Sequence, residues 1–145
     1  MPTVVILCGG RGTRLQEHSS VLPKPLIAVG GRPIVWHVIN MYLAHGFRRF
    51  LLLTGYRADQ VEAFAAAESW PRDVRITCLD TGADTPTGER VRLAAPLLEE
   101  ERFCLAYADG VTDIDSAPCS PTTAAMGVRP PWRSSSRVCR SASPA

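Results

Sequence analysis

The chain has 145 residues, enough for one modest domain with one hydrophobic core. It is 46% hydrophobic and 21% charged, as globular proteins commonly are, and a net charge of +2 without a basic run argues against nucleic acid as a partner. No apolar run reaches the ~20 residues of a membrane span. Since the five cysteines form no CxxC pair and no signal peptide is visible, we expect a reduced, cytoplasmic protein.

The first third of the chain predicts a strand, a turn and a helix. Residues 3–8 form a continuous apolar run, rich in β-branched side chains and stopped by glycine, which is typical of a strand buried on both faces. A turn follows at 30–33, where Pro33 suits the first turn of a helix. That helix is predicted over 34–46, with Gly46 as its stop.

The following elements alternate between strand and helix. In chain order, the apolar patterns predict a strand over 49–55, a helix over 58–68, a strand over 74–80, a helix over 88–100 and a strand over 102–110. Pro96 is expected to break or kink the last of these helices, because proline removes a backbone donor and clashes with the preceding turn.

This alternation predicts an α/β fold, Rossmann-like, with a mainly parallel sheet and helices on both faces. Ligands of such folds bind outside the carboxyl ends of the strands. The glycine-rich loop after the first strand and Asp109 after the last both lie at such ends. We therefore expect the two to meet at one cleft.

The loop "GGRGTRL" (9–15) combines bare backbone with two arginines. Glycines let backbone N–H groups approach a phosphate chain closely. The loop lacks the third glycine of G-x-G-x-x-G, and it is no Walker A loop because no Lys-Ser/Thr follows. Arg11 and Arg14 therefore indicate charge stabilisation on a polyphosphate, with a plain turn after a strand as the alternative.

A lysine held between two prolines follows this loop. Lys24 stands ten residues after Arg14, with Pro23 and Pro25 on either side. The prolines hold its backbone extended, which lowers the entropy lost when the ammonium is aimed at a ligand. Most single lysines are solvated surface charges, but one fixed near a glycine loop favours a phosphate-binding role.

These motifs together carry a resemblance. "LCGGRGTRL" (7–15) followed by "PKP" (23–25) resembles the signature of the sugar-1-phosphate nucleotidyltransferases, which have a glycosyltransferase A-like fold. "LDTGADTPTGERV" (79–91) and "FCLAYADGVTDID" (103–115) are most similar to the glucose-1-phosphate cytidylyltransferase branch of that family. The resemblance covers about residues 3–115 and implies an enzyme.

The resemblance also implies a set of site residues. Arg14 would neutralise the departing pyrophosphate, Lys24 would bridge the reacting phosphates, and Asp109 would hold Mg²⁺. Arg11 is a weaker candidate for charge neutralisation. Nucleotide-binding positions would be Leu7, Cys8, Gly9, Gly10, Arg11, Gly12, Thr13, Arg14, Lys24, Thr85, Arg90 and Ala108. Ala108 stands where the family usually has glycine, so its methyl group would intrude on the ligand.

The implied reaction is a Mg²⁺-dependent transfer of a cytidylyl group from CTP to α-D-glucose 1-phosphate, giving CDP-glucose and pyrophosphate. The implied partners are CTP, or another pyrimidine nucleoside triphosphate, and a hexose 1-phosphate, with neither nucleic acid nor membrane. Family members are expected to be homo-oligomeric. The family's second metal-binding aspartate and its sugar-binding residues lie beyond Asp115, where this sequence shows no match.

Several alternatives stay open at this level. A thymidylyl- or uridylyltransferase would share the glycine loop, and a nucleotide-binding fragment without turnover would share the whole site. A dinucleotide-binding oxidoreductase is disfavoured by the absent third glycine. Asp109 before Gly110 could be a turn residue, and Arg90 could be a charge on a helix surface.

From Ser116 the sequence changes to Ser, Pro, Ala and Arg without a usable period, so 116–145 is expected to be an unstructured tail beside a domain part over 1–115. Back-translation of this segment with mostly G- or C-ending codons, read in another frame, allows a helical Leu/Ala/His run and a β-branched strand. We therefore predict that 116–145 is translated out of frame, which would leave the nucleotidyltransferase domain truncated and the chain inactive.

Overall fold

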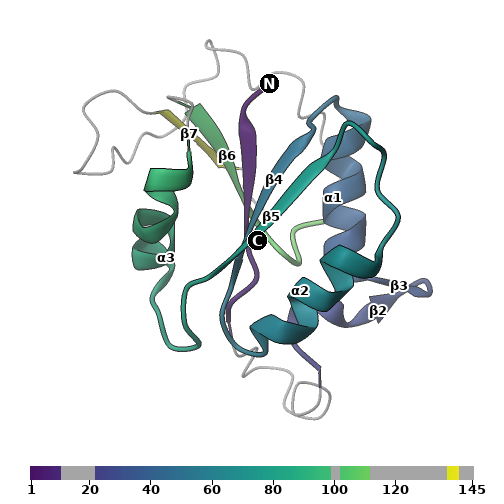
Figure 1. Cartoon of the computed structure of the whole chain (residues 1–145), viewed down its shortest axis with the longest axis horizontal. Helices are drawn as coiled ribbons and strands as arrows, with labels where there is room; N and C mark the ends of the chain where they lie inside the picture. Colours follow the sequence, from purple (N-terminus) through teal and green to yellow (C-terminus); the bar gives the residue numbers. More distant parts are fainter. Residues whose placement is uncertain (11–21, 99–101, 112–136, 141–145) are drawn as a thin grey trace.

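The computed structural model describes residues 1–10, 22–98, 102–111 and, as backbone, 137–140. Its centre is a parallel sheet in the order β5-β4-β1-β6-β7 (Figure 1). The strands are β1 (Thr3–Leu7), β4 (Arg49–Thr54), β5 (Arg75–Asp80), β6 (Arg102–Tyr107) and β7 (Arg137–Arg140). β1 pairs with β4 on one side and with β6 on the other, so the most buried strand lies in the middle.

Helices cover both faces of this sheet, as the alternation predicts. α1 (Ile34–Ala44) and α2 (Ala58–Ala67) lie on one face, and α3 (Thr87–Ala94) lies on the other (Figure 1). The chain moves outward from β1 through β4 to β5 and then crosses back to β6 on the far side of β1. Because right-handed crossovers in opposite directions place their helices on opposite faces, this reversal accounts for the two helix layers.

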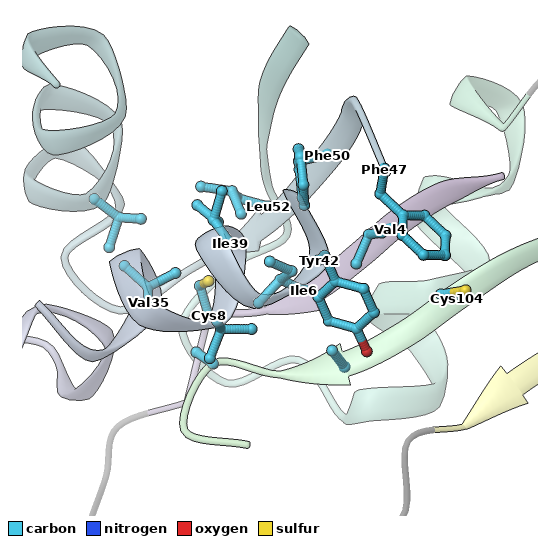
Figure 2. Packing of buried hydrophobic residues seen from close by; sticks show 14 residues of the cluster. Val4, Ile6, Cys8, Val35, Ile39, Tyr42, Phe47, Phe50, Leu52 and Cys104 are labelled. Carbon is cyan, nitrogen blue, oxygen red and sulfur yellow. The ribbon is translucent and has the colours of Figure 1, made fainter. Parts of the chain in front are cut away.

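The two faces bury separate hydrophobic clusters, because successive strand residues point to opposite sides. Val4 and Ile6 of β1 face α1, whereas Val5 and Leu7 face α3. Figure 2 shows the first cluster, in which Val35 and Ile39 of α1 lie against the strands. This packing confirms that β1 is buried on both faces.

The observed element bounds follow the predicted ones, with one shorter strand and one shorter helix. The strand predicted over 102–110 ends at Tyr107, so Asp109 lies in the turn after it. The helix predicted over 88–100 ends at Ala94 and continues as a single 3₁₀ turn, η2 (Ala95–Leu97), that contains Pro96. Proline cannot donate the hydrogen bond that would carry the α-helix further. Gly46 has φ +85° directly after α1, so glycine ends that helix as expected.

A small hairpin occupies the region for which only a turn was predicted. β2 (Ala28–Val29) pairs antiparallel with β3 (Arg32–Pro33). Gly30 and Gly31 between them have φ +59° and +80°. Two consecutive positive φ angles define the type I′ turn that closes two-residue hairpins, and glycine adopts them without strain.

The segment after Ser116 differs from the expected unstructured tail at one place. Residues 137–140 form β7, which pairs parallel with β6 at the edge of the sheet. The free backbone groups of an edge strand readily accept another strand, which accounts for this pairing. Residues 112–136 and 141–145 lie outside the described ranges, so the out-of-frame origin stays a prediction that the nucleotide sequence around codon 116 decides. Within the described ranges, no helix is long and apolar enough to cross a bilayer.

One buried and one half-buried thiol, Cys8 and Cys78, should make the stability of this fold depend on alkaline pH. Burial, with a smaller contribution from Glu62, raises the pKa of Cys78 to about 11, and burial raises the pKa of Cys8 further. In the unfolded chain a cysteine loses its proton near pH ~8.5. Between these values only the unfolded state loses the protons, so we expect the free energy of unfolding to fall as pH rises from about 9 to about 11.

Urea titrations at several pH values measure this decline, and Cys78→Ala is the comparison variant. It should show a shallower decline than the wild type, because one of the shifted thiols is gone. An identical fall of the unfolding free energy with pH in the two proteins would contradict the partial burial assigned to Cys78.

Candidate functional site

A cavity of about 360 Å³ opens at the carboxyl ends of the strands. It lies where the strand order reverses between β1 and β6, which is the position at which α/β folds bind ligands. Every candidate site residue within the described part of the chain lines it: Leu7, Cys8, Gly9, Gly10, Lys24, Thr85, Arg90, Ala108 and Asp109. Arg11, Gly12, Thr13 and Arg14 lie outside the described residues.

The backbone that leaves β1 toward the glycine turn is held by hydrogen bonds from both sides. The amide of Cys8 donates to Leu53 O at 2.9 Å, and the amide of Tyr56 donates to Gly9 O at 3.2 Å. On the other side, the amide of Ala108 donates to Leu7 O at 3.3 Å. A Cβ on Gly10 would meet no heavy atom of the described residues within 4 Å, so this glycine faces open space where a ligand can approach the backbone.

Lys24 and Asp109 meet across the cavity although 85 residues separate them. Lys24 begins η1 (Lys24–Leu26), and Pro23 before it is extended, with φ −65° and ψ 145°. Its ammonium forms an ion pair with the carboxylate of Asp109, which follows β6, and both side chains are about 40% exposed. An exposed pair of this kind is worth about 0–1 kcal/mol, so a ligand can separate the two charges at little cost.

The carboxylate of Asp109 is a group that could hold a magnesium ion at the cavity. Mg²⁺ is commonly held by one or two carboxylates, several waters and substrate phosphate oxygens. Asp109 supplies a carboxylate that already receives a cation, the ammonium of Lys24. The described residues contain no group of three His, Cys, Asp or Glu side chains that would enclose a metal on their own.

Arg90 lies in α3 but reaches under the cavity, where it is 4% exposed. Its guanidinium donates to Gly9 O at 3.0 Å, Thr54 O at 3.1 Å and Ala83 O at 3.2 Å, and also to Thr81 Oγ1. Burial lowers the pKa of Arg90, and the carboxylates of Asp80 and Asp84 oppose that shift. The alternative of a charge on the helix surface is therefore wrong.

The loop after β5 forms part of the wall of the cavity. Thr81 Oγ1 donates to Thr54 O at 2.7 Å, and Thr85 Oγ1 donates to Thr81 O. Lining residues that the sequence analysis did not single out are Pro25, Ala83, Asp84, Pro86, Thr87 and Tyr107. Most belong to the stretch 79–91, so their closeness in sequence to Thr85 could have indicated that they line the cavity. The methyl group of Ala108 packs in the cluster under α1 while the residue still lines the cavity.

The sheet is doubly wound, and a bare glycine turn, a lysine and a carboxylate lie at its switch point. This arrangement defines an α/β domain of the nucleotide-binding class. Comparison with known sequences narrows this class. The profile of the MobA-like NTP transferase domain matches residues 4–110, and the chain belongs to this family.

Individual relatives agree with the family assignment. The chain is 35% identical over 130 residues to a probable glucose-1-phosphate cytidylyltransferase of Bacillus subtilis (strain 168), covering 77% of this chain and 51% of the relative. It is also 35% identical over 136 residues to the glucose-1-phosphate cytidylyltransferase of Salmonella typhimurium, with the same coverage. These matches confirm the resemblance stated from the motifs.

A solved structure extends the agreement to the fold. HddC from Yersinia pseudotuberculosis complexed with GMP-PN superimposes with a TM-score of 0.68 at 27% identity, over 79% of this chain and 51% of that one. The α/β fold class is thus confirmed. The chain spans about half the length of the curated relatives it matches.

Proposed function

We propose that the chain carries the nucleotide-binding part of a glucose-1-phosphate cytidylyltransferase. In the proposed reaction a phosphate oxygen of α-D-glucose 1-phosphate attacks the α-phosphorus of CTP, and pyrophosphate leaves. The observation that carries this proposal is the meeting of Gly10, Lys24 and Asp109 in one cavity at the switch point. The 35% identity to two glucose-1-phosphate cytidylyltransferases supports the choice of base and sugar.

The residues of the chain act in this proposal by positioning and by electrostatic stabilisation. The bare backbone at Gly9 and Gly10 receives the triphosphate, and the ammonium of Lys24 turns from Asp109 to the α-phosphoryl and sugar phosphate. Arg14, outside the described residues, is assigned to the leaving pyrophosphate. Asp109 would hold Mg²⁺, which supplies neutralising charge on the triphosphate when bound. The cytoplasmic setting and the homo-oligomeric assembly stay predictions.

Pyrophosphate release measured with each nucleoside triphosphate in the presence of Mg²⁺ and glucose 1-phosphate tests the proposal. In a form of the protein that carries the whole domain, more pyrophosphate release is expected with CTP than with the other triphosphates. A preference for dTTP or UTP would move the assignment to a thymidylyl- or uridylyltransferase. Calorimetric binding of CTP without release would instead support a nucleotide-binding domain without turnover.

The Asp109→Asn variant should bind CTP with less dependence on Mg²⁺ than the wild type. The amide is a much weaker ligand for a hard cation than the carboxylate, so the increase in CTP affinity on adding Mg²⁺ should shrink by about tenfold. Titration calorimetry with and without Mg²⁺ measures this difference.

Asp73→Asn is the matched control, because it also removes one negative charge from an exposed ion pair, here with Arg48. Asp73 does not line the cavity, so its Mg²⁺ effect should equal that of the wild type. Equal Mg²⁺ effects in both variants would contradict the role of Asp109.

A further inference from the structure

The guanidinium of Arg90 donates its hydrogen bonds to other groups of the protein. Nη1 donates to Thr54 O and Thr81 Oγ1, and Nη2 donates to Gly9 O and Ala83 O. A guanidinium has five N–H groups, two of them on each terminal nitrogen. These bonds therefore account for both hydrogens of Nη1 and both of Nη2, which leaves neither nitrogen a free donor for a phosphate or a base.

The acceptors belong to three segments that are far apart in the sequence. Gly9 follows β1, Thr54 ends β4, and the residues from Thr81 to Ala83 follow β5. These strands are neighbours in the sheet, so the three segments leave the same edge side by side. Backbone bonds run alongside, since the amide of Thr81 also donates to Thr54 O at 2.9 Å. One side chain thus ties together three adjacent strand ends beneath the cavity.

Two glycines leave room for this guanidinium. A Cβ on Gly9 would overlap it, and a Cβ on Gly55 would stand 2.6 Å from Nη1 and overlap the carbonyl oxygen of Gly82. By contrast, a Cβ on Gly88, in the same helix as Arg90, would meet no heavy atom of the described residues within 4 Å. The bare backbone at Gly9 and Gly55 is therefore matched to the position of Arg90.

We propose that Arg90 is a positioning residue of the nucleotide site. Its guanidinium holds the Gly9 turn at a fixed place against the 81–85 loop, and the nucleotide binds to the groups so held instead of to Nη1 and Nη2. With strands about 4.8 Å apart, the ends of β1 and β5 lie about 10 Å from each other, a span that suits the phosphates at one end and the nucleoside at the other. This inference rests on the proposed function.

The first test needs no ligand. Hydrogen exchange is followed at the amides of Tyr56 and Thr81, whose acceptors, Gly9 O and Thr54 O, also accept from Arg90. Arg90→Lys keeps the charge, but a single ammonium nitrogen cannot reach acceptors on three segments. Protection of these two amides should fall at least tenfold, while protection of Leu52 within the sheet stays within about twofold of the wild type. Undiminished protection at Tyr56 and Thr81 would overturn the inference.

The second test measures CTP affinity by calorimetry on the same folded proteins. Arg90→Lys and Gly55→Ala should each weaken CTP binding at least tenfold, whereas Gly88→Ala should match the wild type. Added methylguanidinium should restore part of the affinity of Arg90→Ala, which a role in global stability alone would not produce. Reduced protection with unchanged CTP affinity would overturn the positioning role. If the wild type binds no CTP while Arg90→Lys still loses amide protection, the proposed function is overturned. Arg90 would then only hold the three strand ends together.

Discussion

In a form of the protein that carries the whole nucleotidyltransferase domain, replacing Lys24 with alanine should lower the release of pyrophosphate from CTP by about 10²–10³-fold. Losing one preorganised donor from a site where charge develops typically has an effect of this size. The ammonium is preorganised because the backbone on both sides of Lys24 is fixed: Pro23 is extended and Pro25 is buried. Its ion pair with Asp109 is solvent-exposed and weak, so the ammonium is available when a triphosphate enters the cavity.

The matched control for Lys24→Ala is Arg75→Ala, which also removes one positive charge. Arg75 begins β5, at the end of the sheet opposite the cavity, and is exposed. Both variants are compared with the wild type in pyrophosphate release and in CTP affinity. Equal losses from the two substitutions would show that net charge, and not the position of Lys24, determines the effect.

A second measurement uses the fact that Lys24 is the only lysine in the chain. An amine-acylating reagent therefore modifies Lys24 and the amino group of Met1, and peptide mass spectrometry separates the two. CTP with Mg²⁺ should slow acylation of Lys24 and leave Met1, which is 71% exposed, unchanged. Equal protection of both amines would contradict a specific contact of Lys24 with the nucleotide.

The strands and helices around the site could be predicted because their patterns are local. A strand buried on both faces is a continuous apolar run, and the run before Gly9 became β1 at the centre of the sheet. The β2–β3 hairpin was not predicted as strands, because two-residue strands are too short to show a period.

The candidate site could be predicted only in part. The glycine loop and Asp109 were expected at one cleft because both follow strands, and Lys24 was expected near that loop. The structure places Lys24 and Asp109 in contact. The burial of Arg90 could not be foreseen, since its acceptors are mostly backbone carbonyls, which every residue carries. Gly55 was likewise missed, because the sequence gives no sign that Arg90 from α3 approaches it.

The Leu52→Ala variant should lower the free energy of unfolding by about 2–5 kcal/mol, much of the stability of a small domain. Leu52 is fully buried in β4, where it is aligned with Ile6 of β1 and Cys78 of β5. It belongs to the cluster that α1 covers, so truncation leaves a cavity between the sheet and that helix. The same sheet positions the glycine turn and Thr54, so the loss should also lower the fraction of chains with an assembled nucleotide cavity.

Leu97→Ala makes the same chemical change at a site that is 50% exposed in η2, and it should stay within about 0.5–1 kcal/mol of the wild type. Urea unfolding followed by circular dichroism measures both variants at a protein concentration low enough to avoid association. The slope of the unfolding free energy against urea concentration should be unchanged, so a loss of stability appears as a lower midpoint of unfolding. Because the two substitutions remove the same atoms, a larger loss at Leu52 reports burial alone, and equal losses would contradict the central place of β4 in the fold.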